Sequence, residues 1–144
     1  ERPLPGGELA WGFAWRVLDL VGKGGVVSLL LPAMGFLLNC TRSTVKARRA
    51  WLREATIQRI INFSDLRFQL FERAIRPTVL CLFRRADDNV TNYRFDYWCP
   101  KVDRHLPATG VLTLPSADRA RLNLGRVARG WPVAADRRPP DRRA

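Results

Sequence analysis

Histidine and cysteine are scarce in this chain of 144 residues, and their scarcity excludes several kinds of site. His105 is the single histidine, so a histidine-based metal centre or a Ser-His-Asp triad would depend on that one side chain. Cys40, Cys81 and Cys99 are odd in number and widely spaced, and they form neither a disulfide framework nor a Cys-x-x-Cys pair. The sequence therefore predicts no metal site and a reducing, cytoplasmic location.

Long hydrophobic runs are also missing. The most apolar stretch, residues 26–38, contains Pro32 and Gly35 and is shorter than the roughly 20 residues that a membrane-spanning helix requires. Residues 8–21 mix acidic and basic side chains without the cationic stripe of a helix that lies on a membrane surface. We therefore expect no membrane partner.

Acidic residues are few, whereas arginine is abundant. The chain has 13 Asp and Glu against 25 Lys and Arg, of which only Lys23, Lys46 and Lys101 are lysine, and its net charge is +12. Its length and its 47% of apolar residues are typical of one globular domain. This charge favours a polyanionic partner such as nucleic acid, but it does not name an activity.

The order of apolar patterns predicts an α/β fold. Residues 8–21 carry apolar side chains at three- and four-residue spacings before Gly22, which is typical of an amphipathic helix. Residues 26–31 are continuously apolar, as in a strand buried on both faces of a parallel sheet. A loop over residues 32–39 and a second helix over residues 43–54 follow. The inner positions of that helix are expected to be Val45, Ala50, Trp51 and Leu52, and the outer ones Lys46, Arg48, Arg49 and Arg53.

Further strands are expected at residues 57–62, 78–83 and 93–98, and the last of them is expected to be a sheet-edge or extended strand. Residues 63–77 form a connection that is longer than a hairpin needs. Residues 106–144 hold eight Arg and three Asp and predict a basic, poorly ordered tail, because their C-terminal end has no apolar face to bury. The structured part is therefore expected to span residues 1–105.

Four segments occur in a set order along the chain. They are GVVSLLLP at residues 25–32, IINFSDL at 60–66, LF at 70–71 and TVLCLF at 78–83. In their order and spacing these segments resemble the later half of the catalytic domain of the adenine-specific DNA N6-methyltransferases, as found in large restriction-modification methylases. The resemblance covers residues 8–103, about two-thirds of the chain.

This resemblance implies a partial class I S-adenosylmethionine-dependent methyltransferase sheet of the Rossmann-like type. Residues 26–31 would be its fifth strand, and residues 57–62 and 78–83 its antiparallel sixth and seventh strands, with flanking helices. The family's glycine-rich cofactor loop and its Asn-Pro-Pro-aromatic tetrapeptide precede this region. Residues 1–105 are therefore expected to be the C-terminal part of a catalytic domain, inactive alone, with the main S-adenosylmethionine motif and the catalytic residues outside this chain.

The resemblance also implies a group of site residues. An adenine must leave the duplex before its amino group can reach a methyl donor, and an aromatic side chain holds the flipped base by stacking. In the family this aromatic residue lies between the sixth and seventh strands, which corresponds to Phe71 here. Arg73 and Arg76 flank it and are expected to contact DNA phosphates.

Two of these assignments have structural alternatives. Phe71 is the candidate for base stacking, but it can also pack in the core beside Leu66, Phe68 and Leu70. Asn39 follows the first predicted strand and is a candidate for lining the cofactor or base pocket. Its alternative role is to end a loop or cap a helix.

The sequence thus predicts a fragment of a site-specific DNA methyltransferase that transfers a methyl group from S-adenosylmethionine to adenine N6, in a restriction-modification system. DNA is the expected partner, and a restriction endonuclease or a specificity domain are candidate protein partners. The alternative is a non-catalytic, basic nucleic-acid-binding module or a specificity subunit. A glycine-rich loop and an Asn-Pro-Pro-aromatic tetrapeptide encoded upstream of Glu1 would decide for the methyltransferase.

Overall fold

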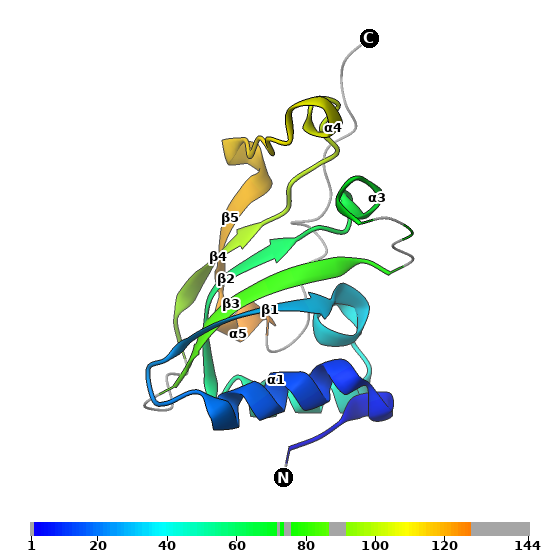
Figure 1. Cartoon of the computed structure of the whole chain (residues 1–144). Coiled ribbons are helices and arrows are strands. Elements are labelled where there is room, and N and C mark those ends of the chain that lie inside the picture. Colours follow the sequence, from blue (N-terminus) through cyan, green and yellow to red (C-terminus); the bar gives the residue numbers. More distant parts are fainter. Residues whose placement is uncertain (1, 72, 74–75, 87–91, 128–144) are drawn as a thin grey trace.

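The computed structural model describes residues 2–71, 73, 76–86 and 92–127 (Figure 1). Within these residues, five strands form one mixed sheet in the order β1-β3-β2-β4-β5. β1 and β2 are both antiparallel to β3, and β4 is parallel to β2 and antiparallel to β5. β1, β2 and β4 therefore run in one direction. The bounds are β1 Val26–Pro32, β2 Ala55–Asn62, β3 Thr78–Arg85, β4 Arg94–Trp98 and β5 Arg119–Asn123.

Two longer helices, α1 (Leu9–Leu20) and α2 (Arg42–Trp51), pack on one face of this sheet (Figure 1). α1 buries Trp11, Ala14, Trp15 and Leu18, the i, i+3, i+4, i+7 stripe of a helix that covers a core. The other face of the sheet carries the alternate side chains of each strand. The shorter helical segments are η1 Pro5–Gly7, η2 Met34–Leu38, α3 Arg67–Leu70, α4 Leu106–Thr109, η3 Ser116–Asp118 and α5 Leu124–Val127.

A chain of aromatic rings forms the centre of the core. Trp11 lies 5.1 Å from Phe36, Phe36 lies 5.2 Å from Trp51, and Trp51 lies 4.7 Å from Phe83, all measured between ring centroids. The Trp51 indole Nε1–H also donates to the Ala14 carbonyl at 3.0 Å. These contacts join both helices, η2 and β3, and tilted or edge-on rings at such distances are favourable beyond the area they bury.

The helix expected at residues 8–21 and the strands expected at 26–31, 57–62 and 78–83 are confirmed by α1, β1, β2 and β3. The expectation that the first strand is buried on both faces is wrong. β1 is an edge strand of the described sheet, and Val26 and Leu30 are 60% and 51% exposed. Helices cover the described sheet on one face only, so alternate residues of β1 point away from the core.

Two predictions about the second half of the chain need correction. Residues 93–98, expected as a sheet-edge or extended strand, form β4, which is not at an edge of the described sheet but lies between β2 and β5. The poorly ordered tail expected from residue 106 is wrong for residues 106–127, because β5 pairs with β4 and Leu122 and Leu124 are buried in the core. One short strand among arginines has too few apolar positions to stand out in the sequence. Residues 128–144 lie outside the described residues.

The second predicted helix is confirmed as α2, but its faces differ from the expectation. Its buried residues are Thr44, Ala47, Arg48 and Trp51. Arg48, expected on the outer face, is 2% exposed. Thr44, Ala47, Arg48 and Trp51 follow the three- and four-residue spacing of an inner face. Arg48 is held there by backbone carbonyls that accept from its Nε and Nη2.

Candidate functional site

Three strands end at the same edge of the sheet (Figure 1). β1, β2 and β4 run in one direction, and α/β sheets bind their ligands at the carboxyl ends of such strands. η2 and Asn39 follow β1, α3 and Phe71 follow β2, and Cys99 and Lys101 follow β4. Arg73 precedes β3 at the same end of the sheet. The segments that carry the predicted site residues therefore come together here, and we call this region the carboxyl edge.

Phe71 ends α3 in the connection between β2 and β3. Its backbone N–H donates to the Arg67 carbonyl at 3.0 Å, and its side chain is half-buried. Of the three neighbours named for core packing, Leu66 is fully buried, whereas Phe68 and Leu70 are 69% and 37% exposed. The base-stacking role of Phe71 stays a prediction.

Arg73 and Arg76 are both exposed in the same connection. Exposure is what a contact with DNA phosphate requires. Arg73 has a φ of 56°, a left-handed conformation that costs an L-residue about 1–2 kcal/mol. The phosphate contacts of both arginines stay predictions.

Asn39 joins η2 to α2. Its side-chain oxygen accepts from the Thr41 N–H at 2.9 Å, and its own N–H donates to the Met34 carbonyl at 2.8 Å. Thr41 then caps α2, because its hydroxyl oxygen accepts from the Thr44 N–H at 3.4 Å. These bonds are those of a loop-ending residue, and the pocket-lining role of Asn39 stays a prediction.

Arg48 also lies at the carboxyl edge, although the sequence analysis placed it on the outer, solvent-exposed face of the second helix. Its Nε donates to the Phe36 carbonyl at 3.1 Å, and its Nη2 donates to the carbonyls of Leu37 and Asn39 at 2.6 and 2.9 Å. Burial lowers the pKa of Arg48 from its ordinary value. One guanidinium thus fixes the last turn of η2, the segment that follows β1. Arg48 follows Thr44 by four residues, and this helical spacing was the feature of the sequence that could have placed both side chains on the same inner face.

The end of β4 is tied to the β2–β3 connection by a buried lysine. Lys101 Nζ lies 3.3 Å from Cys99 Sγ and 3.1 Å from an Asp65 carboxylate oxygen. Burial lowers the pKa of Lys101, but the hydrogen bonds and charges of Asp65 and Cys99 raise it by more, so this ammonium stays protonated. Gln69 in α3 adds a bond from its Nε2 to the Asp103 carbonyl at 2.9 Å. The segment that leads to Phe71 is therefore anchored to the chain that follows β4.

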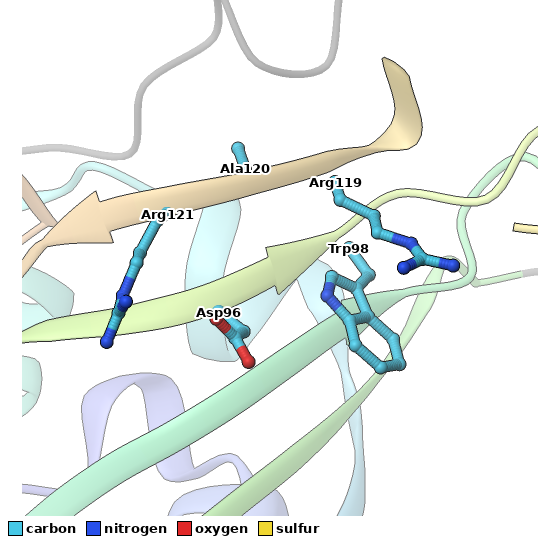
Figure 2. A pocket seen from close by; sticks show the side chains of 5 residues that line it. All are labelled: Asp96, Trp98, Arg119, Ala120 and Arg121. Carbon is cyan, nitrogen blue, oxygen red and sulfur yellow. The ribbon is translucent and has the colours of Figure 1, made fainter. Parts of the chain in front are cut away.

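A shallow hollow of about 360 Å³ lies on β4 and β5 (Figure 2). It is on the face opposite to the buried side chains of Phe95 and Tyr97, which we call the outer face. It is lined by Asp96, Trp98, Arg119, Ala120 and Arg121, so none of the predicted site residues takes part in it. The side chains of Asp96 and Trp98 follow the outward positions of β4, which alternate with buried Phe95 and Tyr97.

Among the residues that the structure describes, no group of three or more His, Cys, Asp and Glu side chains could hold a metal ion. None of the described helices is long and apolar enough to cross a membrane.

Comparison with known proteins gives a match in structure but none in sequence. No family model and no curated protein matches the chain. A chain of a type I restriction-modification system superposes with a TM-score of 0.61 at 12% identity, over 83% of this chain and 30% of its own length. This chain therefore shares its fold with part of that protein. The M protein of the type I restriction enzyme EcoKI, of enzyme class EC 2.1.1.72, matches with a TM-score of 0.52 at 14% identity, over 66% of this chain and 21% of its own.

The type IIG restriction endonuclease BpuSI matches with a TM-score of 0.53 at 18% identity, over 83% of this chain and 15% of its own. The chain thus spans between 15% and 30% of the length of these proteins. Identities this low show a common fold and leave the activity to be argued from the site. The mixed α/β sheet is similar to part of a methyltransferase chain.

Proposed function

We propose that this chain is part of a site-specific DNA methyltransferase of a restriction-modification system, and that the whole enzyme transfers a methyl group from S-adenosylmethionine to adenine N6. The shared fold with a type I restriction-modification chain, at a TM-score of 0.61 over 83% of the chain, carries this proposal. The net charge of +12 supports DNA as the partner. Within the methyltransferase sheet, β1, β2 and β3 correspond to the proposed fifth, sixth and seventh strands.

The carboxyl edge explains how this part of the enzyme would act on DNA. The adenine amine is a weak nucleophile whose lone pair is delocalised into the ring, so it must be flipped out and held beside the methyl donor. Phe71 would stack on the flipped base, and Arg73 and Arg76 would hold the flanking phosphates. Bonds from Lys101 to Asp65 and between Gln69 and Asp103 restrain this connection, and restrained supports make a site more precise.

S-adenosylmethionine would supply the methyl group, and its main binding motif is proposed to lie outside this chain. The hydrogen bonds that Asn39 already makes limit which of its atoms could contact a ligand in that pocket. Its side-chain oxygen accepts from Thr41, and its carbonyl accepts from Arg48. These oxygens do not fit a direct role as cofactor ligands, so the Asn39 amide nitrogen is the group that would face a ligand.

A substitution of Phe71 tests the proposal in an enzyme restored to full length. Phe71→Ala is expected to slow methyl transfer at limiting DNA by roughly tenfold to a hundredfold, because stacking of one base on an aromatic ring is worth about 1–3 kcal/mol. Phe71→Trp should retain much of the activity. Affinity for S-adenosylmethionine and the midpoint of thermal unfolding should stay near those of the unchanged enzyme.

Phe68→Ala is the matched control, because Phe68 is an exposed phenylalanine of the same connection. It should leave methyl transfer unchanged. Core packing would be the right role for Phe71 if Phe71→Ala lowered the free energy of unfolding by about 3–5 kcal/mol while methylation per folded molecule persisted.

A non-catalytic nucleic-acid-binding module or specificity subunit is the second candidate, favoured by the cluster of exposed arginine on the outer face of β4 and β5. Both candidates bind DNA, and a restriction endonuclease or a specificity domain remain the proposed protein partners. Binding of radiolabelled S-adenosylmethionine by the full-length protein separates them, because only the methyltransferase needs a methyl donor.

A further inference from the structure

The hollow on the outer face of β4 and β5 is built around one tryptophan between arginines. Arg59, on the neighbouring strand β2, places its Cζ 3.8 Å from the centroid of the Trp98 ring, and the Cζ of Arg119, on β5, lies 5.6 Å from it. Both distances are within the range of cation–π attraction. An Asp96 carboxylate oxygen accepts from Arg59 Nη2 at 3.1 Å and so holds that guanidinium over the ring.

Arg119 and Arg121 provide the charge of this surface that no carboxylate of the described residues pairs, and Arg119 Nη2 also donates to the Leu114 carbonyl at 2.8 Å. They face Trp98 and Asp96 across the β4–β5 pairing, and Figure 2 shows their side chains on the same side of the strands as the tryptophan and the aspartate. Both are exposed. In the described part of the chain, Arg59 is the cation that forms an ion pair with Asp96, and neither Arg119 nor Arg121 forms one. Two charges therefore remain uncompensated beside the hollow.

We propose that this face of β4 and β5, next to the carboxyl edge and distinct from the β2–β3 connection that carries Phe71, binds the phosphodiester backbone of DNA. Arg119 and Arg121 are the phosphate contacts, and Trp98 with Asp96 positions Arg59 next to them. The inference rests on the proposed function only for the identity of the polyanion as DNA.

Two features favour a phosphodiester over other anions. Residues two apart on one strand face lie about 6.8 Å apart, a spacing close to that of neighbouring phosphates along one nucleic-acid strand. A guanidinium offers paired N–H donors that suit a phosphate better than an ammonium does. Arg59 already forms an ion pair with Asp96 through its Nη2, so the charge that an anion in the hollow would neutralise comes from Arg119 and Arg121. Because Trp98 already orders Arg59, little side-chain freedom is lost on binding.

The test measures binding of the whole chain to a fluorescent DNA duplex at several salt concentrations. Replacing both Arg119 and Arg121 by Gln should weaken binding at low salt by roughly tenfold and make the slope of log K against log salt shallower by about 1.8, since each phosphate contact contributes about 0.9. The matched control replaces Arg16 and Arg53, which are exposed, by Gln. It removes the same charge and should leave the slope close to that of the unchanged chain.

Substitution of Trp98 separates positioning from charge. Trp98→Ala removes no charge, so it should weaken binding severalfold without changing the salt slope, and Trp98→Phe should restore most of the affinity. Circular dichroism and the thermal midpoint check that each variant is folded.

The proposal is overturned if the Arg119→Gln, Arg121→Gln variant is folded and keeps the salt slope of the unchanged chain. It is also overturned if polyglutamate of equal charge competes as well as unlabelled DNA, because the surface would then bind acidic protein. Failure of the unchanged chain to bind DNA would remove both this surface and the DNA partner proposed above. A normal rate of methyl transfer in Phe71→Ala counts against the carboxyl edge alone.

Discussion

Trp51→Ala is expected to lower the free energy of unfolding by about 3–5 kcal/mol, the cost of removing a large aromatic side chain from a core. Trp51 is fully buried, contacts both Phe36 and Phe83, and donates its indole N–H to the Ala14 carbonyl. The substitution opens a cavity where α1, α2, η2 and β3 meet and leaves that carbonyl without this donor. Urea denaturation followed by circular dichroism measures the loss.

Trp98→Ala is the control for Trp51→Ala, because the same side chain is removed from the outer face of the sheet. It should cost well under half as much as Trp51→Ala. A loss below about 1 kcal/mol for Trp51→Ala would contradict the packing described here, since that is less than a core tryptophan contributes.

Arg48→Met is expected to lower the free energy of unfolding by about 2–3 kcal/mol. Three backbone carbonyls in and after η2 lose their charged donor, and an unsatisfied buried polar group costs about 1–3 kcal/mol. Part of this loss is offset, because the desolvation penalty of the buried guanidinium disappears together with the guanidinium. Hydrogen exchange should rise most at residues 33–39.

Arg48→Lys should show most of the same loss, because an ammonium keeps the charge but lacks the planar fork that reaches three carbonyls. The control is Lys46→Met on the exposed side of α2, which should change stability by less than about 0.5 kcal/mol. A more stable Arg48→Met protein would mean that desolvation outweighs the three hydrogen bonds.

The positions of α1, α2 and β1 to β3 could be predicted from the sequence because each depends on a local apolar pattern. The order of the strands could not. β3 inserts between β1 and β2, and such pairing depends on contacts between segments far apart in the chain. β5 was missed because its apolar positions, Ala120 and Leu122, alternate with arginines and are too few to signal a strand.

The candidate site also has residues that the sequence could predict and residues that it could not. Phe71, Arg73 and Arg76 come from one connection that the family resemblance identifies, and the structure places that connection at the carboxyl edge. Arg48 was assigned to solvent because charge usually decides which face of a helix is exposed. The partners of Trp98 come from β2 and β5, so no local pattern could predict the surface they form.

The strand order has a consequence for how this chain folds. β1 forms its described ladder with β3, where Val26 faces Arg84 and Pro32 faces Thr78, so closing it means closing a loop of about fifty residues, which slows folding. At a synthesis rate of about 5–20 residues per second, β1 leaves the ribosome roughly 3–10 s before the end of β3. During that interval an apolar strand has no partner in its own sheet, and another nascent chain can pair with it.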